Sequence, residues 1–95
     1  MVTHIVMWKL KAENKEANKL EMREQLLALK DKIVQLNEIR VEFNLPEADA
    51  GNCDVMLFTK FENFEDLDIY AKHPEHLKVV SFIKSVVEQR VAIDY

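Results

Sequence analysis

The stretch Tyr70-Ala71-Lys72-His73-Pro74-Glu75-His76 marks where one helix should end and the next begin. Proline disfavours the helical conformation in the residue before it, so a helix that carries Tyr70 should end near Lys72 or His73. Proline also fits the first position of a helix, so a second helix should begin at Pro74. The chain is therefore expected to turn a corner here, with Tyr70 before the corner and His76 after it.

The corner brings a phenol and an imidazole within reach of each other. His76 falls in the first turn of the second helix, near free backbone N–H groups and the positive end of the helix dipole. A positive field disfavours the imidazolium ion, so we predict that His76 is neutral at pH 7 and can accept a proton. Tyr70 lies one turn before the break. The two side chains are a candidate acid–base pair.

Size and composition indicate a single globular domain over residues 1–95. Apolar residues make up 48% of the chain and charged residues 32%, a balance typical of folded proteins. The net charge of −4 argues against a nucleic-acid partner, which needs a basic surface. No run of about 18 apolar residues occurs, so we expect no membrane span. The single glycine is too few for a nucleotide-binding loop, and we expect no cofactor.

The cysteine content and the start of the chain indicate a cytoplasmic location. Cys53 is the only cysteine, so it forms no disulfide within the chain and has no basic cluster nearby to make it reactive. A structured stretch begins almost at Met1, without the pattern of a signal peptide. We therefore expect a protein of the reducing cytoplasm.

Four segments read as strands, and they sort into two kinds. The segments Thr3–Leu10 and Asp54–Phe61 are apolar on both parities, which is typical of strands covered on both faces. Glu38–Leu45 alternates between apolar and polar residues, as does the segment from Val86 or Val87 to Tyr95. The first pair should be central in the sheet and the second pair at its edges.

The segments between the strands read as helices. Lys15–Leu36 should form one helix, with Asn14 as its cap. Two shorter helices should follow, one with Asn63 as its cap and one that begins at Pro74. The order is then β-α-β-β-α-(α)-β, a ferredoxin-like α+β fold. The residues expected to face inward are Met22, Leu26, Leu29, Ile33 and Leu36, widened by Leu20, Leu27 and Val34, then Phe64, Leu67 and Ala71, and finally Leu77, Val80, Ile83 and Phe82.

The sheet should have one apolar face that this chain does not cover. The helices pack on one face, and the central strands still carry large apolar groups on the other. A wide exposed apolar face favours association. We therefore predict a homodimer in which two sheets pack face to face.

Several motifs resemble the stress-responsive A/B barrel (Dabb) family. The markers are His4-Ile5-Val6-Met7-Trp8-Lys9, Phe61-Glu62-Asn63-Phe64-Glu65-Asp66-Leu67, Tyr70-x-x-His73-Pro74-x-His76 and Asp94-Tyr95. The resemblance covers nearly the whole chain and implies a dimeric α+β barrel with a cavity between the helices and the sheet.

The resemblance also implies a chemistry. In the olivetolic acid cyclase-like polyketide cyclases of the family, the tyrosine and the second histidine of the Tyr-x-x-His-Pro-x-His motif are the catalytic pair, which by motif match are Tyr70 and His76. The family often has a glycine before the asparagine of the second strand. Here Phe43 precedes Asn44, so the cavity is expected to be narrower or differently shaped.

Three further residues are candidates for contact with a ligand. His4 either borders the cavity or pairs with a neighbouring polar group. His73 precedes Pro74 and either caps the new helix or reaches a substrate. Trp8 either lines the cavity or belongs to the core. His73 and His76 have the spacing of a chelating pair, but Pro74 interrupts the turn and the third histidine is remote, so we expect no metal site.

These observations leave three functional hypotheses. The first is a homodimeric domain that binds a small apolar or carbonyl ligand, or a partner, in a stress response. The second is a cofactor-independent lyase or cyclase in which His76 removes a proton next to a carbonyl and Tyr70 stabilises the oxygen. The third is a haem-handling or oxygenase activity, in which a histidine would be the axial ligand.

Overall fold

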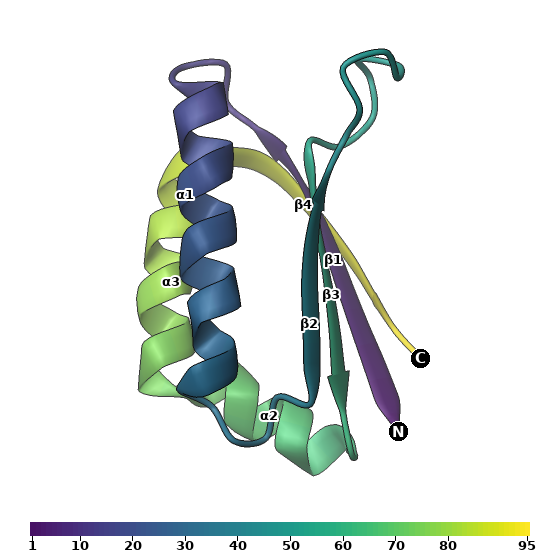
Figure 1. Cartoon of the computed structure of the whole chain (residues 1–95), viewed down its shortest axis with the longest axis vertical. Helices are drawn as coiled ribbons and strands as arrows, with labels where there is room; N and C mark the ends of the chain where they lie inside the picture. Colours follow the sequence, from purple (N-terminus) through teal and green to yellow (C-terminus); the bar gives the residue numbers. More distant parts are fainter.

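The computed structural model describes all residues, 1–95, as a four-stranded antiparallel sheet with helices on one face (Figure 1). The sheet has the order β2-β3-β1-β4, so the fold is the ferredoxin-like α+β class predicted from the sequence. The elements are β1 (Val2–Leu10), α1 (Lys15–Ala28), the short 3-10 helix η1 (Leu29–Asp31), β2 (Glu38–Phe43), β3 (Val55–Phe61), α2 (Phe64–Lys72), α3 (Pro74–Val86) and β4 (Val87–Asp94).

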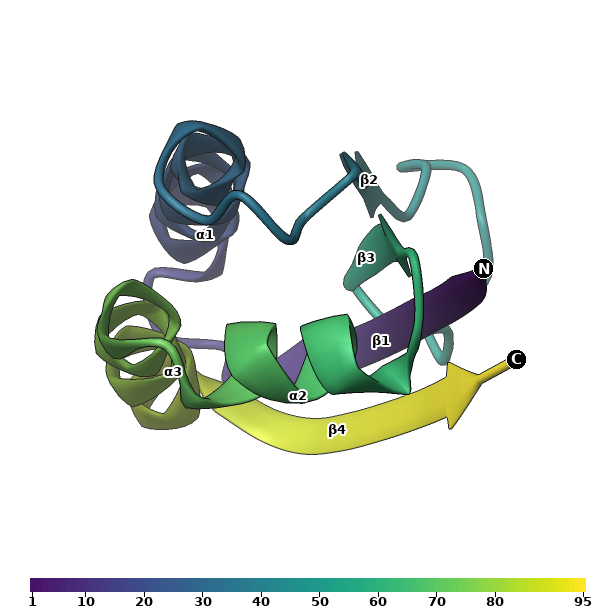
Figure 2. The same ribbon diagram turned by 90° about the horizontal axis from the view of Figure 1, so that it is seen from below.

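The two strands with apolar residues on both parities are the central pair, as predicted. β1 pairs with β3 on one side and with β4 on the other, and β2 pairs only with β3. Seen from below, α1 lies toward the β2 edge, whereas α2 and α3 lie toward the β4 edge (Figure 2). Different helices therefore cover the two edges of the sheet.

A register shift between Lys9 and Leu10 changes which residues of β4 face the helices. Trp8 pairs with Arg90 and Lys9 with Gln89, but Leu10 pairs with Val87, so Glu88 is skipped. This β-bulge breaks the single parity that the sequence predicted for β4. Val87 and Arg90 are consequently on the same, helix-covered side of the sheet.

The main apolar stripe predicted for the first helical segment is buried in the core, but the residues predicted to widen this stripe are exposed. Leu20 and Leu27 are exposed because, at about 100° per residue, they lie on the opposite side of α1 from Met22. Val34 is also exposed, since the α-helix ends at Ala28 and not at Leu36 as predicted. The residues of the stripe that are buried are Met22, Leu26, Leu29, Ile33 and Leu36.

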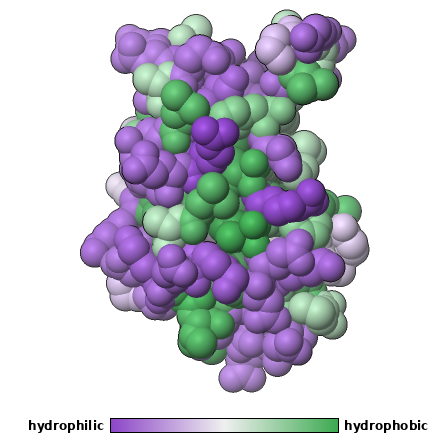
Figure 3. Space-filling model, in the orientation of Figure 1, coloured by the Kyte–Doolittle hydropathy of each residue, from purple (hydrophilic) through white to green (hydrophobic).

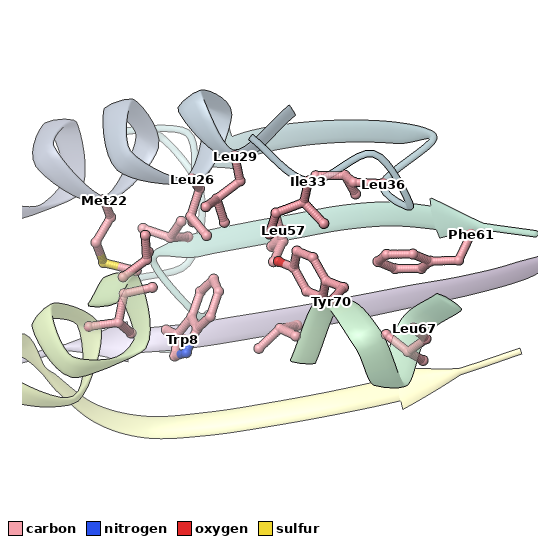
Figure 4. Close-up of a cluster of buried hydrophobic side chains, with 14 of the residues drawn as sticks. Trp8, Met22, Leu26, Leu29, Ile33, Leu36, Leu57, Phe61, Leu67 and Tyr70 are labelled. Atoms are coloured by element: carbon pink, nitrogen blue, oxygen red, sulfur yellow. The ribbon is translucent and has the colours of Figure 1, made fainter. Parts of the chain in front are cut away.

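The inward residues of the last two helices are only partly those predicted. Leu67 and Ile83 are buried, but Phe64, Ala71 and Leu77 are exposed. These three border a cavity between α2, α3 and the sheet instead of filling the core. Val79 and Tyr70 are buried in their place, packed in the same cluster as Trp8, Leu26 and Leu57 (Figure 4).

Local capping fixes the ends of α2 and α3. The side chain of Asn63 accepts a hydrogen bond from the Asp66 N–H at 2.8 Å, which confirms the predicted cap. His73 ends α2 and caps α3, since its Nδ1 accepts from the Glu75 N–H at 3.1 Å. Asn14 does not cap α1 as predicted: it has a left-handed backbone (φ 53°) and makes no side-chain cap bond.

The face of the sheet away from the helices exposes apolar side chains, as predicted. Met7 is 39% exposed, and its neighbour Val91 is 38% exposed. Ile93, further along β4, is 59% exposed. We call this surface, formed by Ile5, Met7, Met56, Phe58, Val91 and Ile93, the outer face.

The β2 edge presents a different surface. Figure 3 shows a band of hydrophobic surface running between α1 and β2, with hydrophilic residues on both sides. Phe43 at the end of β2 is half-buried here, under the cations of Lys19 and Arg23 at 5.0 Å and 4.9 Å from its ring centre. These long side chains cover the aromatic ring from solvent.

The first and last strands are joined near the chain ends. The Thr3 N–H donates to the Tyr95 carbonyl at 2.6 Å, and the Tyr95 N–H donates to the Thr3 carbonyl at 2.9 Å.

None of the helices has the length and apolar character that crossing a membrane would require.

Candidate functional site

A cavity of roughly 930 Å³ lies between the sheet and the α2–α3 corner. Twelve of its eighteen lining residues are hydrophobic, and its walls come from β1, α2, α3 and β4, with Leu26 and Leu57 contributing from α1 and β3. We call its exposed lining residues the rim, and these are Phe64, Asp68, Ala71, Leu77, Lys84, Arg90 and Asp94. The cavity is therefore apolar inside and charged at its edge.

Tyr70 projects from α2 into the space between the helices and the sheet (Figure 4). The residue is only 1% exposed, and its hydroxyl has no hydrogen-bond partner in the protein. Its ring packs against Phe61, with ring centres 5.0 Å apart. Burial raises the pKa of the phenol well above its ordinary value of 10.0, so the hydroxyl keeps its proton and acts as a hydrogen-bond donor.

His76 lies directly against Tyr70, with ring centres 4.3 Å apart. Its Nδ1 is 3.0 Å from the carbonyl oxygen of Ala71. A carbonyl only accepts, so Nδ1 carries the proton and Nε2 carries the free lone pair. The corner at Pro74 thus brings a donor hydroxyl and an imidazole that can accept a proton to one wall of the cavity.

The pKa of His76 is lowered from 6.5, which agrees in direction with the neutral imidazole predicted from the sequence. The main cause is burial, which disfavours the charged form, and the hydrogen bond to Ala71 opposes it. Electrostatic interactions with His4, Arg90 and His73 lower the pKa of His76 further.

His4 also lines the cavity, and its Nδ1 makes a short contact with the Asp94 carboxylate. The pairing of β1 with β4 places these two residues opposite each other. Both alternatives for His4 therefore hold, because the residue borders the cavity and pairs with a polar neighbour.

The other two candidate residues differ in their positions. Trp8 is 5% exposed and belongs both to the core cluster and to the cavity wall. His73 is outside the cavity lining, since its ring is used to cap α3. No three His, Cys, Asp or Glu side chains lie close enough together to hold a metal ion.

The family model described as the stress responsive A/B barrel domain matches residues 2–95. This chain belongs to that family. The stress-responsive A/B barrel identity confirms the resemblance drawn from the motifs at the start of β1, at the α2–α3 corner and at the end of β4.

Similar proteins share the fold of this A/B barrel domain. DABB1 of Arabidopsis thaliana, a stress-response A/B barrel domain-containing protein, is 25% identical over 100 residues, which cover 100% of this chain and 46% of that protein. The chain thus spans less than half the length of this curated relative. A dimeric protein of unknown function and ferredoxin-like fold from Bacteroides fragilis is 30% identical, with a TM-score of 0.90 over 99% of this chain and 93% of that one. The hydroxynitrile lyase of Passiflora edulis has a TM-score of 0.86 at 18% identity, over 99% of this chain and 90% of that one, which shows the shared fold alone.

Phe43, where the A/B barrel family often has glycine, does not shape the cavity as we expected from the sequence. It lies at the far end of β2 under α1 and is absent from the cavity lining. It borders a smaller and more open hollow of roughly 420 Å³ near the loop that joins β2 to β3. Phe43 therefore does not narrow or reshape this cavity by lining it, as the sequence led us to expect.

Two charged rim residues were not singled out from the sequence. Lys84 lies two turns after His76 on α3, so the helical repeat alone could have placed both on one face. Arg90 had no such signal, because a polar residue of an alternating edge strand has the pattern of a solvent-exposed one, and only its pairing with Trp8 shows that it faces the helices.

Proposed function

We propose that this protein is a homodimer that binds a small, largely apolar ligand with a carbonyl group in the cavity between its helices and sheet. The observation that carries this proposal is the buried Tyr70 hydroxyl, which has no partner in the protein and lies beside His76 in the cavity wall. Leaving a buried hydroxyl unpaired costs about 1–3 kcal/mol. A ligand oxygen that accepts from Tyr70 would recover this energy.

The size and lining of the cavity support a small organic ligand. Its volume of roughly 930 Å³ is within the usual range for small-molecule sites. At the α2–α3 corner the lining offers the Tyr70 hydroxyl as a donor and the His76 ring as an acceptor, among mainly hydrophobic residues. Such a lining favours an apolar molecule with a single polar group near the α2–α3 corner.

The outer face supports the homodimer. Ile93 and Met7 are exposed on a face that no helix covers, and Arg40 and Lys60 cover only part of the Phe58 ring. The similar protein from Bacteroides fragilis is described as dimeric. Pairing two outer faces would bury these apolar groups and leave the cavity, on the other side of the sheet, open.

The ligand proposal is tested by calorimetric titration with methyl hexyl ketone on the wild type, Tyr70→Phe and Tyr95→Phe. Tyr95 is exposed and outside the cavity, so its change removes a hydroxyl without touching the site. We expect Tyr70→Phe to weaken ketone binding about tenfold, the value of one hydrogen bond, and Tyr95→Phe to have no effect. Equal ketone affinity in the wild type and Tyr70→Phe would contradict the proposal.

A second candidate function is a cofactor-independent lyase or cyclase. The neutral His76 and the protonated Tyr70 support it, because Nε2 can take a proton from the carbon next to a carbonyl while the phenol donates to the enolate oxygen. Return of the proton to carbon regenerates both groups.

This step has its own readout. In deuterium oxide, methyl hexyl ketone should exchange the protons next to its carbonyl faster with the wild type than with His76→Gln, as followed by proton NMR. Exchange at the buffer rate with the wild type would support the binding role without catalysis.

A further inference from the structure

We propose that the ligand carries one carboxylate, which Lys84 and Arg90 hold at the rim of the cavity. This inference rests on the proposed ligand-binding function and adds the chemical class of the ligand. It assigns a second contact region at the rim of the cavity, formed by one residue of α3 and one of β4.

The first observation is that the rim has two cations without anionic partners. Neither Lys84 nor Arg90 has a carboxylate within ion-pair distance. The two acidic rim residues are already paired, Asp94 with His4 and Asp68 with Lys72 at 2.9 Å. The carboxylates of the rim are therefore engaged by other residues, while its two cations have no anionic partner.

The second observation is that both cations face the cavity from separate elements. Lys84 follows His76 and Val80 at helical spacing, and all three line the cavity along one side of α3. Arg90 pairs with Trp8, which lines the cavity, and therefore lies on the helix-covered side of the sheet. A guanidinium and an ammonium that approach one space from two sides form a suitable site for a carboxylate.

The spacing sets the shape of the ligand. Lys84 is eight residues after His76, which corresponds to about 12 Å along a helix. Val80, Ile83 and Val87 line the cavity, and all three are apolar. The ligand is therefore an elongated acid, with its carboxylate at Lys84 and Arg90, an apolar middle, and a carbonyl at Tyr70 and His76.

A carboxylate fits this rim better than a phosphate. The carboxylates of Asp68 and Asp94 also line the cavity and would repel a doubly charged head group more strongly than a singly charged one. The two unpaired cations are enough to neutralise one carboxylate on the ligand. The two aspartates would repel any additional negative charge on the ligand.

The test compares octanoate with the neutral methyl hexyl ketone and with octyl phosphate, each titrated by calorimetry. We expect the wild type to bind octanoate about tenfold more tightly than the ketone. Lys84→Gln and Arg90→Gln should each weaken octanoate binding about fivefold and leave ketone binding unchanged. Unchanged ketone binding also shows that the variants keep the cavity intact.

The matched control is Lys30→Gln, which removes one exposed positive charge outside the cavity. A loss of octanoate affinity in this control equal to that in Lys84→Gln would overturn the proposal, because it would reflect net charge alone. Equal affinity of the wild type for octanoate and ketone would overturn it while leaving the proposed function intact. Tighter binding of octyl phosphate would overturn the assignment of a carboxylate, and binding of none of the three would overturn both proposals.

Discussion

Tyr70 combines the burial of a core residue with an unused polar group. Its ring fills space between Phe61 and His76, so most of its contribution to stability comes from the ring and not from the hydroxyl. Because no protein group pairs with the hydroxyl, removing it breaks no hydrogen bond within the protein. The phenol oxygen is therefore better explained by a role in binding than by a role in folding.

Tyr70→Phe should raise the free energy of unfolding by about 1–3 kcal/mol, since it removes a buried hydroxyl whose unpaired state costs that much. Tyr70→Ala should lower it by about 3 kcal/mol or more, because the ring itself is removed from the core. Chemical unfolding followed by circular dichroism measures both. A loss in Tyr70→Phe as large as that in Tyr70→Ala would show that the hydroxyl has a structural partner.

His76 should make stability depend on pH. Its pKa in the folded protein is below the ordinary value of 6.5 that it has in the unfolded chain. At a pH between the folded and the unfolded pKa, the unfolded chain therefore binds more protons than the folded one. The free energy of unfolding should therefore fall as the pH drops below about 6.5.

The measurement is urea unfolding at about pH 7.5 and about pH 5.5, at one protein concentration, for the wild type and His76→Gln. The variant should lose less stability between the two pH values. Glu75 titrates in a lower range, because Lys78 and Lys32 hold the pKa of its carboxyl below 4.5. If the wild type and His76→Gln lost the same stability between the two pH values, His76 would have the same pKa in the folded and the unfolded chain.

At the scale of the elements, α2 is a short helix whose start depends on a single side chain. Asn63 accepts from the Asp66 N–H, and α2 has only nine residues to hold Tyr70 in the cavity wall. Asn63→Ala should lower the free energy of unfolding by about 1 kcal/mol. Asn63→Asp keeps an acceptor oxygen and should retain most of that stability. Thermal unfolding of both variants checks this, and equal midpoints for the two would contradict a capping role.

Elements determined by neighbouring residues were predicted well from the sequence. Pro74 with His73, and Asn63 with Asp66, set helix ends through contacts within four residues, so the corner that holds Tyr70 and His76 could be placed in advance. The contrast between strands apolar on both parities and alternating strands likewise placed the central pair correctly.

Features that depend on distant pairing were not predicted. Arg90 faces the cavity only because β4 pairs with β1, some eighty residues away in the chain, and sets Arg90 opposite Trp8. The bulge opposite Lys9 and Leu10 also depends on this pairing, and it brings Val87 to the same side of the sheet. The exposure of Phe64 and Leu77 has a similar origin, since an apolar residue at the rim of a cavity has the same local pattern as one in the core.

For the whole molecule, the two faces of the sheet have separate tasks. The helix-covered face provides the cavity, and the outer face provides the proposed contact with a second copy. Changes to the outer face should therefore alter the oligomeric state without altering ligand binding.

Ile93→Asp places a carboxylate on the outer face, where dimer formation would bury it without a partner. We expect the dissociation constant of the dimer to rise at least about a hundredfold. Leu20→Asp is the matched control, because Leu20 is 53% exposed on α1, away from the sheet, against 59% for Ile93. Analytical ultracentrifugation distinguishes the two, and a wild type with the mass of one chain at micromolar concentration would contradict the dimer.

The hydrogen bonds between Thr3 and Tyr95 have a mechanical consequence. They place the two ends of the chain side by side at one end of the β1–β4 ladder, whose hydrogen bonds run across the strands. A force that pulls the ends apart would act along these bonds and open the ladder one pair at a time, starting from Thr3 and Tyr95. The domain should therefore unzip under low tension, although without force the same pairing holds β4 on the sheet.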